Sequence, residues 1–438
     1  MTPTSISSGG KLRIRFVPLL MVLALLLGAC GSGDGGKKIQ WIEGTAPANL
    51  AAQSTVESGN DVEEEPTSTV NQEGEGDADI KPTATLAPAE PTKKPTERPE
   101  AVSGVRLSAE QLDEFQPNEL GVIPVLEYHT ITTEKREEQF VRTVDDFKAD
   151  LDWLYENDFY VVPLKDLIAN RIAAPAGKRP VVLTFDDSTA GQFRYLIADD
   201  GSVEIDPDSA IGIMEAFYAD HPDFGRGGFF AVLPTVNFCF AWQFADAEPD
   251  QYPYCQQKLT WLMDNGYEVG NHTLNHVDLL QQDDDTFRAE LAGAIVAFQE
   301  MDTRIEANIL AMPFGNYPDL DTKQQQREWL REGFEWKGTT YRIIGSLMVG
   351  DNPTESPVST EYDPVFIARI QAFDDDANLE GGRGSAYWFA IFEDDPGQLY
   401  VSDGSAETIS VPEELPAIME GTLNTDRIEA DGLELIRY

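Results

Sequence analysis

Basic residues are scarce in this sequence. Lysine and arginine together number 32 against 77 aspartates and glutamates, so the 438-residue chain carries a formal net charge of -45. This charge would repel nucleic acids and other anionic polymers, so we exclude nucleic acid as a partner. The acidic surplus favours solubility and identifies no partner by itself.

The sequence also lacks an apolar run long enough to span a membrane comfortably. A short run, Phe16–Leu27, follows basic residues at Lys11, Arg13 and Arg15, which is the pattern of a signal peptide. The run ends in Leu-Gly-Ala-Cys30, which resembles a bacterial lipobox. We therefore expect residues 1–30 to be a lipoprotein signal peptide, with lipidation at Cys30 anchoring the protein at the extracytoplasmic face of the cell membrane. An ordinary cleaved signal peptide with an incidental cysteine is the alternative.

Large apolar residues are rare between residues 31 and 118. This stretch is rich in Gly, Ser, Thr, Pro, Ala and Glu, and such a composition cannot build a hydrophobic core. We interpret residues 31–118 as a disordered linker. Its flexibility would let the following domain act at a distance from the membrane.

Cysteines number only three, and the two that follow the linker are Cys239 and Cys255. No CxxC motif or nearby histidine accompanies them, so a metal site built from these two is disfavoured. In an extracytoplasmic protein we expect them to form a disulfide. Two separate buried thiols are the alternative.

Histidines are also few, and two of the four, His272 and His276, stand close together. They follow a short predicted strand, and the pair Asp186-Asp187 follows another, Val181–Phe185. One carboxylate with two imidazoles suits a zinc-like divalent ion that keeps open coordination positions. The second carboxylate is then free to act as a base. Taken alone, the aspartate pair could be a turn and the histidine pair surface decoration.

Segments that predict strands alternate with segments of helical periodicity from about residue 120 onward. This alternation implies a parallel sheet with right-handed crossovers. In barrel versions of such folds, reactive groups gather at the carboxyl ends of the strands. His129 also follows a predicted strand, 121–128, so we expect it to lie near Asp186, Asp187 and His272.

Three motifs resemble those of polysaccharide deacetylases, the carbohydrate esterase family 4 with its NodB homology domain. They are Thr184-Phe-Asp-Asp187, His272-Thr-Leu-Asn-His276 and Pro313-Phe-Gly315. The segment Ile123-Pro-Val-Leu-Glu-Tyr-His129 is similar to the opening strand of the VPVLxYH subgroup. The resemblance implies an α/β fold, a distorted (β/α) barrel of about seven parallel strands, over residues 119–373. It also implies a divalent metal ion, most often Zn²⁺.

The resemblance further implies a role for each motif residue. Asp187, His272 and His276 would bind the metal, and Asp186 would be the general base. His129 would be the general acid, because no histidine follows His276 and this subgroup carries that residue on its first strand. The substrate-binding segment would consist of Pro313, Phe314 and Gly315.

Two positions depart from the family pattern. Ser188 stands where the first motif usually continues with glycine, and Ala311 stands where the third motif often begins with arginine. In the family that arginine orients the base carboxylate. Arg369, on a later strand, is a candidate to replace it.

An insertion between the first two motifs is rich in aromatic residues. They could form a sugar-stacking wall, or they could pack a small core around the disulfide. The aromatic residues are Phe238, Phe240, Trp242, Tyr252 and Tyr254.

Residues 374–438 follow the region of resemblance. Ala386–Phe392 and Gln398–Val401 read as strands. They could be the final strands of the barrel or a small β extension.

These observations favour a lipid-anchored, extracytoplasmic, metal-dependent deacetylase. It would remove N-acetyl or O-acetyl groups from an acetylated polysaccharide of the cell envelope or matrix, and it would contact the membrane through its lipid anchor. The alternative is a catalytically inactive carbohydrate-binding lipoprotein with the same fold. Asp186 favours the enzyme, because binding alone does not need a base beside three metal ligands.

Overall fold

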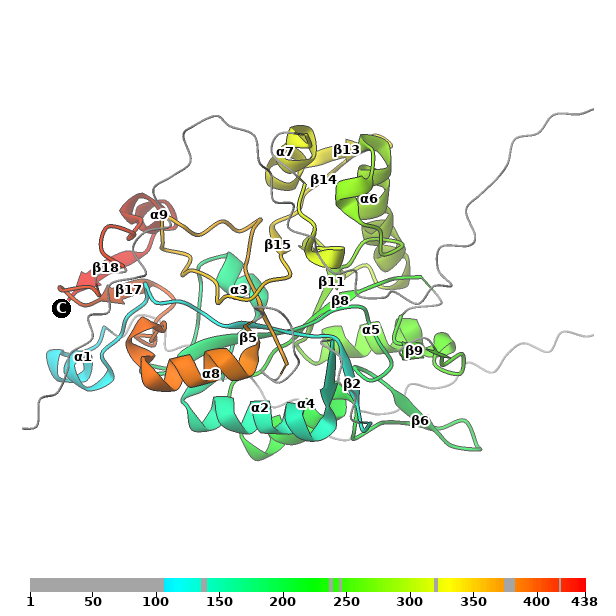
Figure 1. Ribbon diagram of the computed structural model, residues 1–438, viewed down its shortest axis with the longest axis horizontal. Coiled ribbons are helices and arrows are strands. Elements are labelled where there is room, and N and C mark those ends of the chain that lie inside the picture. Colours follow the sequence, from blue (N-terminus) through cyan, green and yellow to red (C-terminus); the bar gives the residue numbers. More distant parts are fainter. Residues whose placement is uncertain are drawn as a thin grey trace, which may run out of the picture. The chain divides into compact units, whose positions relative to one another are not determined.

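A curled parallel sheet organises the computed structural model, which describes residues 106–134, 140–235, 239–243, 246–318, 322–373, 383–416 and 419–438 (Figure 1). The chain divides into two units, Met1–Asp79 and Ile80–Tyr438, and every described residue lies in the second. The expected signal peptide, Cys30 and most of the expected linker lie outside the described residues. Within the described part, no helix combines the length and the apolar character needed to cross a membrane.

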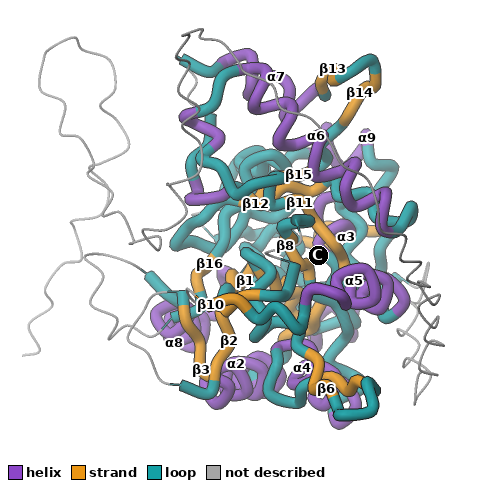
Figure 2. Tube along the Cα trace, turned by 90° about the vertical axis from the view of Figure 1, so that its right-hand side faces the viewer, coloured by secondary structure: helices purple, strands orange, loops and turns teal. Residues whose placement is uncertain are grey.

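The sheet has the strand order β15-β12-β11-β8-β5-β1-β16, with β4 paired to β5, and all of these pairs are parallel. Ile367 pairs with Leu347 at one edge and Ile370 pairs with Leu126 at the other, so one segment touches both edges. Figure 2 shows β16 and β1 at one end of the row and β12 and β15 at the other. The expected α/β fold with a distorted barrel of parallel strands is therefore confirmed. The strands are β1 Val125–Tyr128, β4 Phe159–Val161, β5 Arg179–Phe185, β8 Phe229–Val232, β11 Glu268–Asn271, β12 Ile309–Ala311, β15 Gly345–Leu347 and β16 Ile370–Gln371.

The two faces of the sheet carry separate hydrophobic clusters. On β5, Val182 packs in a cluster inside the barrel, whereas Leu183 packs in the larger cluster outside it. Because side chains alternate along a strand, the inner row of β5 continues to Asp186. The inner row of β1 continues in the same way to Glu127 and His129. Apolar inner rows therefore lead directly to polar groups at the carboxyl end of the barrel.

Helices cover the outside of the sheet. Apolar residues of α2, α4, α5 and α6 belong to the outer cluster, and Figure 1 shows α2 and α4 side by side along one side of the sheet. Apolar residues of α3 join the inner cluster instead. The helix α2 begins after Thr143, whose side chain accepts a hydrogen bond from the Asp146 amide. The helices are α2 Val144–Glu156, α3 Leu164–Ile168, α4 Ala210–Asp220, α5 Cys255–Asp264, α6 Asp284–Met301 and α7 Gln324–Glu332.

Short two-stranded sheets occupy the connections. The pair β2 and β3 is parallel, and the other three pairs are antiparallel. They are β2 Thr130–Thr132 with β3 Val141–Thr143, β6 Tyr195–Ile197 with β7 Val203–Ile205, β9 Trp242–Gln243 with β10 Asp246–Ala247, and β13 Phe334–Trp336 with β14 Thr339–Tyr341.

The end of the predicted linker is wrong, because residues shortly before 118 form the helix α1, Ala109–Phe115. A capping box starts this helix: the Ser108 hydroxyl accepts from the Gln111 amide, and the Gln111 side chain accepts from the Ser108 amide. Asn118 then pairs with Val401 near the other end of the chain. The folded part therefore begins before residue 119.

The predicted strand Ala386–Phe392 is also wrong, because these residues lie in the helix α8, Ser385–Asp394. Phe389 and Phe392 are both buried against the outer cluster, at a spacing that a helix places on one face. The second predicted strand, Gln398–Val401, is reduced to isolated bridges from Leu399 and Val401.

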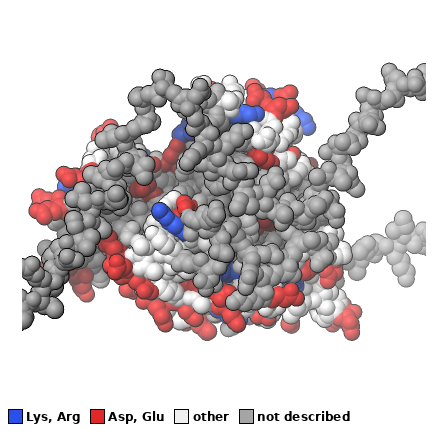
Figure 3. All heavy atoms as spheres, in the orientation of Figure 1, with Lys and Arg blue, Asp and Glu red and all other residues white. Residues whose placement is uncertain are grey.

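A small β extension completes the tail. β17 Thr408–Val411 pairs in parallel with β18 Glu434–Arg437, and α9 Thr425–Ala430 lies between them in sequence. Their apolar residues form a third cluster with Leu120 and Val358. The tail thus has a small β extension (red in Figure 1), but strands other than the two predicted ones build it. On the described part of the face drawn in Figure 3, acidic side chains are the more frequent charged groups.

Candidate metal centre and active site

Reactive side chains from three strands meet at the carboxyl edge of the sheet. Tyr128 pairs with Phe185 at the ends of β1 and β5, so the next residues, His129 and Asp186, are at the same level. His272 follows β11 directly. The Asp186 amide donates a hydrogen bond of 2.9 Å to the Tyr128 carbonyl, which extends the β1–β5 pairing to the site.

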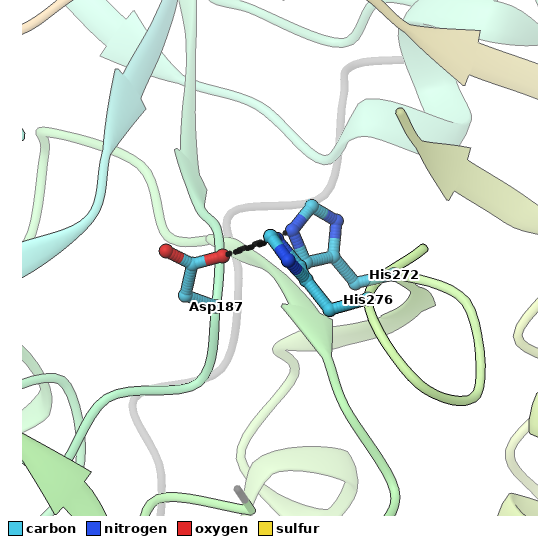
Figure 4. Close-up of side chains that lie close together, drawn as sticks. All are labelled: Asp187, His272 and His276. Carbon is cyan, nitrogen blue, oxygen red and sulfur yellow. Dashed lines mark hydrogen bonds and ion pairs between the residues drawn. The ribbon is translucent and has the colours of Figure 1, made fainter. Parts of the chain in front are cut away.

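Asp187, His272 and His276 converge, as Figure 4 shows. The Asp187 Oδ1 atom lies 3.0 Å from the His272 Nε2 atom and 3.1 Å from the His276 Nε2 atom. One ligand atom from each residue lies within 4.8 Å of the others. The sequence-predicted ligand set is therefore brought together in space.

The three side chains fit a divalent cation. His272 Nδ1 lies 3.0 Å from the Ala311 carbonyl oxygen, an acceptor that places the ring proton on Nδ1 and leaves the Nε2 lone pair facing Asp187. Burial raises the pKa of Asp187, but the neighbouring imidazoles of His272 and His276 outweigh that effect and hold the pKa well below its usual range. Two imidazoles and one carboxylate match the donor set of a zinc site with open positions.

The loop between the two histidines is held by α6. The Glu290 Oε2 atom accepts hydrogen bonds from the Leu274 amide at 3.1 Å and the Asn275 amide at 2.9 Å. The Glu290 Oε1 atom accepts another from the Asn275 side chain at 2.8 Å. Glu290 is buried, so a carboxylate of the helix serves as the anchor of the loop that carries His276. Glu290 is not predicted from the sequence, because its distance along the chain from His276 gives no sign of the contact.

Left-handed backbone conformations gather at the site. A positive φ is uncommon for residues other than glycine and costs about 1–3 kcal/mol, so such residues persist where the surroundings hold them. Ser188, which stands where the family usually has glycine, has a φ of 49°. Two hydrogen bonds hold it in this conformation: its Oγ accepts from the Leu233 amide at 3.2 Å, and its carbonyl accepts from the Phe240 amide at 2.8 Å. The other residues of this kind at the site are Asp187, Thr273, His276 and Phe314.

Arg369 lies against Asp186. Its Nη1 atom donates to Asp186 Oδ1 at 2.8 Å and its Nη2 atom donates to Asp186 Oδ2 at 2.7 Å, a bidentate pair that is fully buried. Burial raises the pKa of Asp186, but the charge and hydrogen bonds of Arg369 lower it below its usual value overall. Asp186 is therefore ionised and held in one orientation, although Ala311 replaces the arginine of the third motif.

His129 and Glu127 face the same space from β1. His129 is nearly buried, and its ring centroid lies 4.6 Å from that of Phe140. Burial lowers the pKa of His129, against the charges of Asp187 and Asp186. The sequence analysis missed Glu127, although its place two residues before His129 puts both side chains on the inner face of the barrel.

The third motif lies beside the second. Pro313–Gly315 form a single turn of 3₁₀ helix in which Pro313 is buried and Phe314 is 54% exposed. The Phe314 ring centroid lies 4.7 Å from that of His276. An exposed aromatic face next to the predicted metal ligands is suited to contact with a sugar ring.

The aromatic insertion mainly packs a core. Cys239 and Cys255 form the expected disulfide, and Phe240 beside it is fully buried. Trp242 is half-buried and its Nε1 atom donates to the Asp187 carbonyl at 3.3 Å, so the insertion contacts the backbone of a predicted metal ligand. Phe238 lies outside the described residues.

Residues 233–329 match a family model described as polysaccharide deacetylase, and this stretch contains the second and third motifs. No curated protein sequence matches the chain. Three similar solved structures are the Streptococcus pyogenes deacetylase PplD in complex with acetate (18% identity, 58% of this chain, 93% of that chain, TM-score 0.39), IcaB from Ammonifex degensii (17%, 59%, 94%, 0.36) and a family 4 carbohydrate esterase from Bacillus anthracis (14%, 57%, 86%, 0.25). The narrower VPVLxYH subgroup stays a prediction.

Proposed function

Because residues 233–329 match a family model described as polysaccharide deacetylase, we propose that the protein is a metal-dependent deacetylase of an acetylated polysaccharide. The observation that carries this proposal is an ionised, fully buried Asp186 directly beside the Asp187, His272 and His276 cluster. A binding protein has no use for a base held in one orientation by a buried arginine.

The roles of the side chains follow from their positions. Asp187, His272 and His276 would hold a divalent ion, with Zn²⁺ favoured by the donor set; when bound, such an ion lowers the pKa of water and polarises the acetyl carbonyl. Asp186 takes a proton from the attacking water, and Arg369 keeps it ionised for that step. His129 donates a proton to the leaving amine from the β1 side of the site. Pro313, Phe314 and Gly315 border the position of the sugar.

We also propose that the enzyme is anchored by lipid at Cys30 and acts on an envelope or matrix glycan outside the cytoplasm. The signal-peptide pattern supports this location, and the disulfide between Cys239 and Cys255 is of the kind that persists in oxidising compartments. The acyl group, N-acetyl or O-acetyl, is left to experiment.

The first prediction distinguishes the proposed base, Asp186, from a proposed metal ligand, His272, by their effects on activity and on metal content. Asp186→Asn should abolish acetate release from chito-oligosaccharides and leave the metal content nearly unchanged, because Asp186 is paired with Arg369 rather than with the histidines. His272→Ala should remove both activity and bound zinc. Metal analysis and acetate assays on the purified protein, before and after chelation and zinc reloading, measure these effects.

The control is zinc-loaded wild-type protein tested on chito-oligosaccharides, peptidoglycan and acetylxylan. If it releases no acetate from any of the three, the enzyme proposal fails and the inactive carbohydrate-binding lipoprotein takes its place.

A further inference from the structure

Glu127 is a buried carboxyl group at the site for which no motif accounts. Its side chain is 0% exposed, and its Oε1 atom accepts a hydrogen bond of 3.0 Å from the Arg369 Nη2 atom. Its Oε2 atom is buried and has no hydrogen-bond partner among the described residues. Burying an ionised carboxylate oxygen without a partner costs far more free energy than burying the oxygen of a protonated, neutral carboxyl group.

One cation serves two carboxyl groups here. Arg369 pairs with both oxygens of Asp186 and reaches Glu127 with the same Nη2 atom. Burial raises the pKa of Glu127 to about 8 against the charge of Arg369, and the charges of Asp186 and Asp187 add to the rise. Asp186 accepts two hydrogen bonds from Arg369, whereas Glu127 accepts one and keeps a buried oxygen without a partner among the described residues, so Asp186 is the ionised group and Glu127 keeps its proton.

A second metal ion does not fit this place. Glu127, His129 and Asp186 put one ligand atom each within 4.8 Å of the others. The guanidinium of Arg369 already lies on both carboxyl groups, so a further cation would meet a positive charge at close range. A proton on Glu127, rather than a second metal ion, therefore neutralises the second carboxyl group.

His129 needs a source of protons. Burial holds its pKa below the usual value, so the imidazole is neutral near pH 7 and lacks the proton that a leaving amine takes up. The His129 Nε2 atom lies 3.7 Å from Glu127 Oε1. This is longer than a hydrogen bond, and contacts of this kind between catalytic groups often tighten when substrate binds.

We propose that Glu127 holds the proton that His129 delivers to the leaving amine, an inference that rests on the proposed deacetylase function. Glu127 first gives its proton to the neutral His129. As the C–N bond breaks, its electron pair goes to nitrogen, and nitrogen takes a proton from the imidazolium of His129. Asp186 has meanwhile taken a proton from water and passes it to Glu127. The cycle consumes one acetamide and one water, yields acetic acid and a free amine, and returns all three side chains to their starting state.

An infrared measurement tests the stored proton without any assay of activity. Purified wild-type protein near pH 7 should show the carbonyl stretch of protonated carboxyl groups, and the difference spectrum between the wild type and Glu127→Gln should show that the variant has lost one such band. Glu268→Gln is the matched control: Glu268 is another carboxyl group with a raised pKa, about 7, at the opposite end of β11 from His272. The Glu127 band should survive in that variant.

Steady-state kinetics with a chito-oligosaccharide test the delivery. Glu127→Gln should lower kcat by about 100-fold with little change in KM, as expected for a lost acid–base contribution. Wild-type activity should fall as the pH rises through the range in which Glu127 loses its proton, and the variant should lack that fall. Glu268→Gln should keep the wild-type kcat, and zinc content should be equal in all three proteins.

The outcomes separate this inference from the proposed function. Wild-type-like kcat in Glu127→Gln at every pH, or an infrared spectrum in which that substitution removes no carboxyl band, overturns the role of Glu127. A zinc-loaded wild type without activity on any glycan overturns the proposed function, while the infrared result still decides whether Glu127 holds a proton. If Glu127→Gln does not fold, Glu127→Met replaces it in both measurements.

Discussion

Arg369, the residue just before β16, supplies the positive charge that Ala311 of β12 does not provide. Ala311 and Arg369 are both fully buried, and Ala311 belongs to the cluster inside the barrel. The arginine is held at its stem by a hydrogen bond of 2.7 Å from Nε to the Met348 carbonyl. Its head group is thereby aimed at Asp186, and the small side chain at 311 leaves the interior free of a second cation. The candidate named from the sequence thus pairs in the structure with Asp186, the proposed base.

The prediction at the residue scale concerns this pair. Arg369→Lys keeps the charge but cannot make two parallel hydrogen bonds to one carboxylate, so Asp186 loses its fixed orientation. We expect kcat to fall by about 100-fold, in the range that small misplacements of reacting groups cause. Acetate assays give kcat, and zinc content should not change.

Arg288→Lys, on the exposed side of α6, is the control and should keep the wild-type kcat. Full activity in Arg369→Lys would contradict the orienting role of the guanidinium.

At the scale of elements, α6 sets the position of a proposed metal ligand, His276, that lies outside the helix. Glu290 binds the loop after His272, and the Asn271 side chain donates to the Leu291 carbonyl at 3.0 Å while accepting from the Thr273 amide at 2.8 Å. The loop is thus fastened to the helix at both of its ends. Since Thr273 and His276 have left-handed backbone conformations, these bonds keep the loop in a shape it would not otherwise prefer.

Removing the anchor should loosen the metal site. Glu290→Ala leaves the Leu274 and Asn275 amides without their acceptor, so we expect zinc affinity to fall about 10- to 100-fold, as for other groups that support metal ligands. Competition with a chelator measures the affinity, and the absorption spectrum of the Co²⁺-loaded protein reports on the ligand geometry.

Glu290→Gln retains one carbonyl acceptor and should recover part of the affinity. Unchanged zinc affinity in Glu290→Ala would show that the loop holds His276 without the helix.

At the scale of the whole folded part, Glu119 connects the segment before β1 to the C-terminal residues 400–410. The buried carboxyl group accepts hydrogen bonds from the Ser410 amide at 2.7 Å, the Asp403 amide at 3.2 Å and the Tyr400 hydroxyl at 2.9 Å. Burial raises its pKa well above the usual value, and the charge of Asp403 adds to this. The β extension is therefore fastened to the barrel through a buried polar group as well as through its own apolar cluster.

This contact predicts how global stability depends on pH. Above the ordinary pKa of a glutamate, the unfolded chain releases a proton that folded Glu119 keeps, so the free energy of unfolding of the wild type should fall as the pH rises. In Glu119→Gln that contribution is absent, and the variant should gain stability relative to the wild type from pH 4 towards neutral pH. Denaturant unfolding at several pH values measures the difference, and parallel curves for the two proteins would contradict the prediction.

Much of the site could be predicted from the sequence because its residues stand in short, local patterns. Asp187, His272 and His276 were named as a group, and each follows a strand whose apolar character is visible in the sequence. Glu127 and Glu290 were not named, since a carboxylate in a strand or on a helix looks the same whether it faces solvent or a reactive group. The helix α8 was misjudged because a short apolar run fits a strand and a buried helix equally well.

The sequence by itself determined the alternation of strands and helices, the acidic charge and the residue types available for the chemistry. These depend on spacing and composition, which are local properties of the chain. Only the tertiary structure decided which carboxyl groups share Arg369, and how Glu119 meets the β extension. Those outcomes depend on burial and on distances between residues far apart in sequence, and folding alone creates both.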